Sequence, residues 1–131
     1  MTGDLKALIY ALPGRVNASE PLRRIGRHCS TEFLVEIGDD AHHLLVNRGQ
    51  LERVIPGPLL MRAWSFALRA DEPSWRRFWN PQPDPGFNDL FAMARYGHLR
   101  IEGDVGPLLC HLRYVKEVMA LPRLMLAEAR S

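Results

Sequence analysis

Residues 97–121, GHLRIEGDVGPLLCHLRYVKEVMAL, decide the fold of this chain. Apolar and polar residues alternate over His98–Glu102, which is the period of a half-buried strand. Asp104 follows as an N-cap residue, so the sequence predicts one long helix over Val105–Leu121 that Pro122 ends. We therefore expect a short strand that leads directly into the last long helix.

The predicted last helix is apolar on two nearly opposite sides. One side gathers Val105, Leu108, Leu109, Leu112, Val115 and Met119, and the other gathers Cys110, Tyr114, Val118 and Leu121. A helix of this kind has to bury both sides. We expect one side to cover a sheet, while the other meets the N-terminal helices, a ligand or a partner subunit.

Upstream of the sheet, residues 4–28 have helical character. A first helix is expected to stop at Pro13-Gly14, and a second to begin near Ser19 with Pro21 in its first turn.

The apolar period then changes to two, which is typical of strands. Strands are predicted over Thr31–Gly38, Ala41–Arg48 and Leu51–Ile55, with turns at Gly38-Asp39-Asp40 and Gly49-Gln50 between them. We expect these strands to form an antiparallel meander.

A fourth strand is predicted over Ala63–Ala70, with Trp64, Phe66 and Leu68 on one face. Asp71 then has the position of an N-cap residue.

A short helix over Glu72–Trp79 places Trp75, Phe78 and Trp79 on one face, because they are three and four residues apart. Arg76-Arg77 point the other way.

The segment Asn80–Gly86 carries three prolines and a glycine, so it is expected to be an irregular connector. Asn88 can cap a further helix over Asp89–Tyr96, and Gly97 suits its C-terminal turn. The tail, residues 122–131, is expected to continue as a frayed helix.

Length and composition favour one globular domain of 131 residues, with a helical part at about 4–28, the sheet and helices over 31–121, and the tail. Apolar residues make up 47% and charged residues 24%. The net charge of +2, from 17 basic and 15 acidic residues, argues against a dedicated nucleic-acid binder. The basic pairs at Arg23-Arg24 and Arg76-Arg77 leave a weak contact with an anionic membrane surface open.

The cysteine pattern and the N-terminus favour a soluble cytoplasmic protein. Cys29 and Cys110 are isolated, unlike the closely spaced cysteines of secreted scaffolds. No segment resembles a secretory signal, and the apolar run Leu5–Leu12 is too short to span a membrane.

The sequence carries no convincing motif for catalysis, a metal or a cofactor. His42 and His43 are neighbours on a predicted strand, so they point to opposite faces and cannot share a metal. His28-Cys29 and Cys110-His111 are adjacent pairs, whose side chains rarely meet to activate a thiol.

The segment 97–104 resembles the "G-x-hydrophobic-x-hydrophobic-x-G-D/N" pattern of the sterol carrier protein type 2 family, also called the sterol-binding domain. In that family the segment is a strand that leads into the C-terminal helix. The strand at Trp64–Leu68, followed by Asp71 and Trp75, is also similar to the family. The order of elements agrees from Phe33 to Leu121.

This resemblance implies an α+β fold, with a five-stranded mixed, mostly antiparallel sheet, helices on one face and an apolar cavity between the two layers. It implies non-enzymatic binding of a sterol, a fatty acyl chain or a similar apolar molecule.

Large apolar side chains from separate elements are expected to converge on this space. The candidate ligand-binding residues are Trp64, Phe66, Trp75, Phe78, Trp79, Phe87, Phe91, Leu109, Leu112, Val115 and Met119. The same side chains could instead fill one another's space. The chain would then be a structural or interaction subunit, as a homodimer or as the partner of an enzyme. A small hydrolase or isomerase would need a convergent polar pair inside the pocket.

Overall fold

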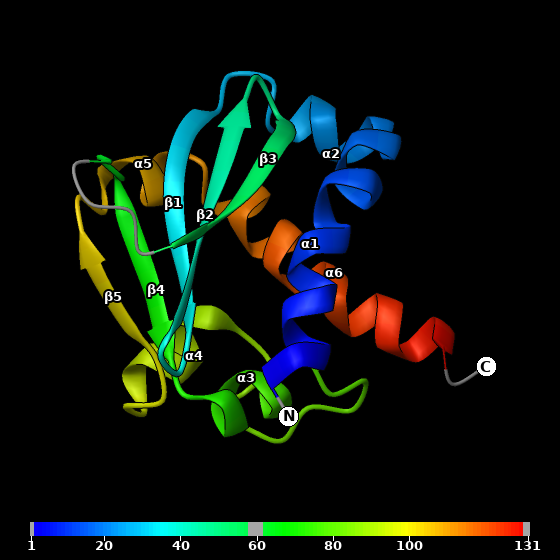
Figure 1. Cartoon of the computed structure of the whole chain (residues 1–131), viewed down its shortest axis with the longest axis vertical. Helices are drawn as coiled ribbons and strands as arrows, with labels where there is room; N and C mark the ends of the chain where they lie inside the picture. Colours follow the sequence, from blue (N-terminus) through cyan, green and yellow to red (C-terminus); the bar gives the residue numbers. More distant parts are fainter. Residues whose placement is uncertain (1, 58–61, 130–131) are drawn as a thin grey trace.

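Five segments with alternating apolar residues form one sheet, in the order β3-β2-β1-β4-β5 (Figure 1). The structure is a computed structural model that describes residues 2–57 and 62–129. The strands are β1 (Ser30–Ile37), β2 (Asp40–Asn47), β3 (Gln50–Gly57), β4 (Phe66–Ala70) and β5 (Arg100–Gly103). β1 and β4 are parallel, and the other neighbouring pairs are antiparallel. The predicted mixed, mostly antiparallel sheet is therefore confirmed.

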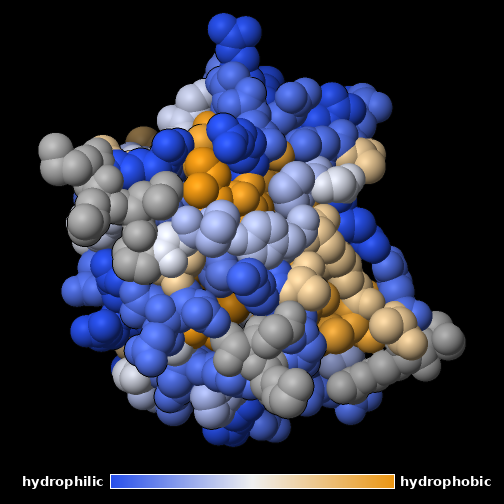
Figure 2. Space-filling model, viewed as in Figure 1, coloured by the Kyte–Doolittle hydropathy of each residue, from blue (hydrophilic) through white to orange (hydrophobic). Residues whose placement is uncertain are grey.

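Helices cover one face of this sheet (Figure 1). They are α1 (Thr2–Ala18), α2 (Glu20–Ile25), α3 (Glu72–Phe78), α4 (Leu90–Arg95), α5 (Gly106–Cys110) and α6 (Leu112–Ala129). None of the helices in the described part of the chain is long and apolar enough to cross a membrane. The surface in Figure 2 is mostly hydrophilic, with apolar side chains gathered beside α1 and α6 and over part of the sheet.

The prediction that α1 stops at Pro13-Gly14 is wrong, because the helix continues to Ala18. A proline inside a helix costs about 3 kcal/mol. Here the buried stripe of α1 continues across it, since Leu12 and Val16 on either side are both fully buried. The start of the next helix near Ser19 is confirmed, because the Ser19 side chain accepts a hydrogen bond from the Leu22 amide.

The capping residues in the sequence predict the bounds of α3 and α4 closely. The Asp71 carboxylate accepts the Ser74 amide at 2.8 Å, so Asp71 caps α3 as predicted. The segment that follows α3 has no helix or strand until α4 begins. Asp89, and not Asn88, precedes the first turn of α4, while Gly97 has the left-handed φ of 81° expected after its end.

The last helix differs from the prediction in two ways. It breaks at His111, whose φ of −119° and ψ of 33° lie outside the helical region, so α5 and α6 are separate. It also continues through Pro122, which is buried in α6. Arg123 donates to the backbone oxygens of Phe78 and Phe87, which helps to hold the helix beyond the proline.

The second apolar side of α6 packs against the N-terminal helices. The Tyr114 ring lies directly on Gly26, at the end of α2, and its hydroxyl donates to the Gly49 backbone oxygen at 2.7 Å. Gly49 turns the β2–β3 hairpin with a φ of 81° and abuts the backbone of Arg23. Tyr114 therefore joins α6, α2 and the hairpin, and the N-terminal helices cover the side for which a ligand or a partner was an alternative.

The outer face of the sheet carries a smaller apolar group and several charges. Leu34, Ala41 and Ala67 are buried there, with Trp64 packed against them. The prediction that Trp64 shares a face with Phe66 is wrong, because the regular strand begins only at Phe66 and strand alternation does not extend back to residue 64.

Asn17 attaches α1 to the exposed edge of the sheet. Its side-chain amide donates to the Leu51 backbone oxygen at 3.0 Å and accepts the Leu51 amide at 2.9 Å. Leu51 belongs to β3, which has a neighbour on one side only. One side chain therefore satisfies both outward backbone groups of this edge residue.

Two glycine substitutions should have opposite effects on stability. Gly14→Ala should raise the free energy of unfolding by about 0.5–1 kcal/mol, because alanine favours helix and its Cβ meets no atom within 4 Å. Gly26→Ala should lower it by about 1–3 kcal/mol, because the new Cβ would lie 2.3 Å from Tyr114 Cδ1. Urea denaturation measures both, and a neutral Gly26→Ala would contradict the placement of the Tyr114 ring.

Removal of the Asn17 side chain should loosen the edge of β3. Asn17→Ala leaves two backbone groups of Leu51 without their partners, at a cost of about 1–2 kcal/mol. Hydrogen exchange at the Leu51 amide should become faster, while exchange in β1 at the centre of the sheet stays slow. An unchanged Leu51 amide would contradict the attachment.

Candidate functional site

The space between the sheet and the helices is apolar and closely packed. Phe33 and Phe66, from the parallel strands β1 and β4, stack with ring centres 4.9 Å apart. Trp75 and Trp79 of the α3 segment also stack at 4.9 Å. Together with both faces of α6 they belong to one continuous buried cluster.

Hydrogen bonds from the two indoles fix the position of α3. Trp75 Nε1 donates to the Glu36 backbone oxygen of β1 at 2.8 Å. Trp79 Nε1 donates to the Met119 backbone oxygen of α6 at 2.7 Å. α3 thus links the sheet to α6, and both aromatic rings are oriented by a polar contact at one end.

The predicted ligand-binding residues fall into three groups in the structure. Phe66, Trp75, Phe78, Trp79, Phe87, Val115 and Met119 are buried between sheet and helices, Phe91 and Leu112 are half-buried against the same cluster, and Trp64 and Leu109 lie elsewhere. Leu109 is 58% exposed, because the break at His111 turns α5 out of phase with α6. Nine of the predicted residues therefore border one apolar layer.

The buried members of this group contact one another. Phe66, Trp75 and Trp79 have no accessible surface, so not even a water molecule fits beside them. A bulky ligand can enter this layer only if side chains move apart.

A hollow of about 230 Å³ opens on this layer between α4 and α6. Phe78, Leu90 and Ala120 contribute its apolar wall. Lys116 and Asp89 stand at its rim, and their charged groups approach to 2.8 Å. The Lys116 Nζ also lies 5.1 Å from the centre of the Phe91 ring. This partly exposed ion pair thus lies at the rim of a hollow whose wall includes the buried side chains of Phe78 and Leu90.

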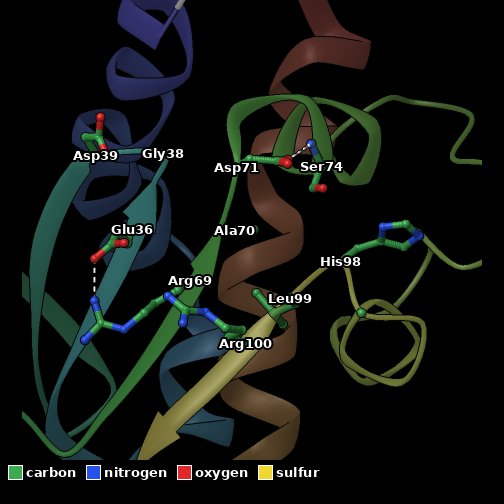
Figure 3. Close-up of a pocket in the computed structure, with 11 residues that line it drawn as sticks. Glu36, Gly38, Asp39, Arg69, Ala70, Asp71, Ser74, His98, Leu99 and Arg100 are labelled. Carbon is green, nitrogen blue, oxygen red and sulfur yellow. Dashed lines mark hydrogen bonds and ion pairs between the residues drawn. The ribbon is translucent and has the colours of Figure 1, made fainter.

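A second hollow, of about 440 Å³, is polar and lies where β1, β4 and β5 meet the start of α3 (Figure 3). Arg69 pairs with Glu36 in this hollow and also with Glu102 beyond it. Arg100 lies directly across from Arg69 in the β4–β5 ladder. Sequence patterns missed this hollow, because its charges come from three strands whose order depends on the tertiary fold.

A third hollow, of about 400 Å³, borders the connector after α3. Phe87 stacks on His98 at 4.5 Å, and the Arg77 guanidinium lies 4.1 Å from the Phe87 ring centre. Phe87 is thereby packed on both sides, at the rim of the apolar layer.

The sheet also separates the two neighbouring histidines, as predicted. His43 faces the outer side, where its Nδ1 lies 2.8 Å from a Glu32 oxygen that Arg62 also contacts. This polar pair is on the opposite face from the apolar layer, so it does not supply a dyad there. Across residues 2–57 and 62–129, no three His, Cys, Asp or Glu side chains gather as metal ligands.

His42 faces the helices and places a polar side chain on the floor of the apolar layer. It is 2% exposed, and neither ring nitrogen has a hydrogen-bond partner among the described residues. A buried polar group without a partner costs about 1–3 kcal/mol. Burial lowers the pKa of this imidazole; the Asp40 charge raises that pKa and the Lys6 charge lowers it.

The two cysteines do not form a disulfide bond. Cys29 is buried and Cys110 is exposed, and both are free thiols. Burial raises the pKa of Cys29 to about 11, which favours the protonated thiol at neutral pH.

No family model matches the sequence, and no curated protein is similar enough to match it. Solved structures do match. A crystal structure of sterol carrier protein 2 is 19% identical, with a TM-score of 0.70 over 89% of this chain and 94% of that chain.

Two further solved structures agree with this match. A Thermus thermophilus protein, described as possibly a sterol carrier protein, is 16% identical, with a TM-score of 0.63 over 88% of this chain and 86% of that one. A UbiJ-SCP2 ubiquinone synthesis protein is 17% identical, with a TM-score of 0.58 over 92% of both chains. The chain described here therefore has the fold of sterol carrier protein 2.

Proposed function

We propose that this chain binds or carries a lipid-like apolar ligand, such as a fatty acyl chain or a sterol, without catalysing a reaction. The observation that carries the proposal is the continuous apolar layer between sheet and helices, in a chain with the fold of sterol carrier protein 2. The proposed wall consists of Phe66, Trp75, Phe78, Trp79, Phe87, Phe91, Leu112, Val115 and Met119.

Ligand entry requires this wall to rearrange, and its composition supports that. Met119 is unbranched, and so is Met93 in the same cluster, so both can change shape at low cost. Leu112 and Phe91 are only partly buried, near the ends of α6 and α4. The hollow beside Lys116 and Asp89 is the proposed mouth, because opening it breaks one exposed ion pair, worth about 0–1 kcal/mol.

A second candidate is an interaction subunit that carries no ligand. The complete burial of Phe66, Trp75 and Trp79 favours it, because these side chains already fill the space they enclose. One of the similar solved structures is described as a ubiquinone synthesis protein, so the partner of a biosynthetic enzyme is one form of this candidate. A homodimer is the other.

Native mass spectrometry and organic extraction of the purified protein separate the two candidates. A carrier should release a lipid on extraction and show the matching mass increase in the native spectrum. A ligand-free dimer, or a ligand-free monomer that takes up no lipid from vesicles, would favour the interaction subunit and count against the carrier.

Enlarging one wall residue should block uptake. Leu112→Trp adds a bulky ring beside the apolar layer, so uptake of a fluorescent fatty acyl ester should fall about tenfold or more, equivalent to at least about 1.4 kcal/mol. Leu124→Trp is the matched control, because Leu124 lies on the same helix but is 55% exposed. Circular dichroism establishes that both variants fold, and equal uptake by the two would place the ligand elsewhere.

A further inference from the structure

The position of His42 on the helix-covered face is fixed by the register of the sheet. His42 of β2 pairs with Val35 of β1 on one side and with Pro56 of β3 on the other. Val35, and Leu44 two residues further along β2, both belong to the apolar cluster that contains Trp75, Trp79 and Met119. The imidazole therefore projects from the same surface that forms the floor of the apolar layer.

Helix α1 covers this imidazole with an aromatic ring. Tyr10 meets His42 edge-on, with ring centres 5.6 Å apart and an interplanar angle of 89°. Tyr10 is 37% exposed, and Lys6 Nζ lies 5.8 Å from the centre of its ring. Ile9, one residue before Tyr10, is fully buried. Tyr10 thus covers part of His42 from a helix that is packed firmly at the neighbouring Ile9.

His42 differs from the other buried aromatic polar side chains in its hydrogen bonding. The buried indoles and the Tyr114 hydroxyl each donate to a backbone oxygen, and His43 contacts Glu32. Among residues 2–57 and 62–129 His42 has neither kind of partner, although both of its nitrogens are buried. Buried polar groups in folded proteins nearly always have a partner, so a partner that is not part of the described chain is the natural explanation.

We propose that His42 is the hydrogen-bonding contact for the polar head of the apolar ligand, so that the ligand is a long apolar molecule with one neutral hydroxyl or carbonyl group. This inference rests on the proposed function and specifies how the ligand is oriented. The apolar part lies along the α3 and α6 side chains, and the head reaches β2.

The hydrogen-bonding groups of the buried imidazole determine which polar head group of a ligand it can bind. A neutral imidazole offers one N–H donor and one nitrogen acceptor. A hydroxyl can use either of these, and a carbonyl can use the donor. A pure hydrocarbon leaves both unpaired, and a charged head would have to lose its hydration in an apolar layer. The groups that face His42 from the neighbouring elements are Tyr10 and Lys6 on α1 and Asp40 on its own strand.

A pair of chemically matched probes tests the head contact. 1-Hexadecanol and hexadecane are offered separately from cyclodextrin complexes, and the bound amount is measured by extraction and gas chromatography. The unaltered chain should prefer hexadecanol by about fivefold, the effect of one net hydrogen bond. His42→Leu should lose this preference, and His42→Gln, which keeps a donor and an acceptor, should retain part of it.

The neighbouring histidine provides the control. His43→Gln changes an equally buried histidine on the outer face, so the preference for hexadecanol should stay as in the unaltered chain. Uptake of both probes with the same preference in the unaltered chain and in His42→Leu would overturn the role of His42 and leave the carrier proposal standing. Uptake of neither probe by the folded, unaltered chain would overturn both.

The pH dependence of stability tests whether His42 is neutral and buried in the native chain. Because burial lowers its pKa in the folded state, the unfolded chain binds the proton more readily. Stability from this group is therefore present above the ordinary histidine pKa of 6.5 and is lost as the pH falls below it. The urea midpoint should fall more between pH 7.5 and 5.5 in the unaltered chain than in His42→Leu; parallel profiles would show an exposed imidazole, which contradicts the head contact.

Discussion

The burial of both apolar sides of α6 is the constraint on which the rest of the structure depends. One side lies on the aromatic residues of α3 and the sheet, and the other lies on α2 through Tyr114. Hydrogen bonds fix the depth of this packing, because Trp79 donates to the Met119 backbone of α6 and Tyr114 to the backbone of the β2–β3 turn. Glycine at position 26 lets the tyrosine ring approach the backbone directly. If α6 moved away, the sheet, the N-terminal helices and the α3 segment would all lose their common neighbour.

Local sequence patterns predicted the sheet well, and they failed where tertiary packing outweighs a local rule. Alternation in Phe33, Val35 and Ile37 is decided within a few residues, and those side chains do face the core. Pro13 and Pro122 are helix breakers by themselves, yet Pro13 lies inside α1 between the buried Leu12 and Val16, and Pro122 is itself buried inside α6. Nothing local in the sequence marks His111 as the point where the last helix breaks.

The same difference between local patterns and tertiary packing applies to the residues of the candidate site. Sequence patterns identified nine residues that border one apolar layer, because large apolar side chains at regular spacing have few other places to go. They misplaced Trp64, whose strand begins two residues later, and Leu109, whose helix is rotated by the break at His111. They discounted His42 because its neighbour points away from it. Whether the His42 ring has a hydrogen-bond partner depends on all the elements that pack around it, so no local sequence pattern could reveal that it lacks one among the described residues.

The Asn17 side chain also occupies part of the open edge of the sheet at β3. An open sheet edge is a template on which a strand from another molecule can add, and β3 is such an edge. By occupying both outward groups of Leu51, the Asn17 amide imitates a neighbouring strand at that point and interrupts the row of free donors and acceptors. The opposite edge, β5, has only four residues and offers a short template. The same contact that positions the first helix thus leaves a shorter stretch of the β3 edge free to pair with a strand of another molecule.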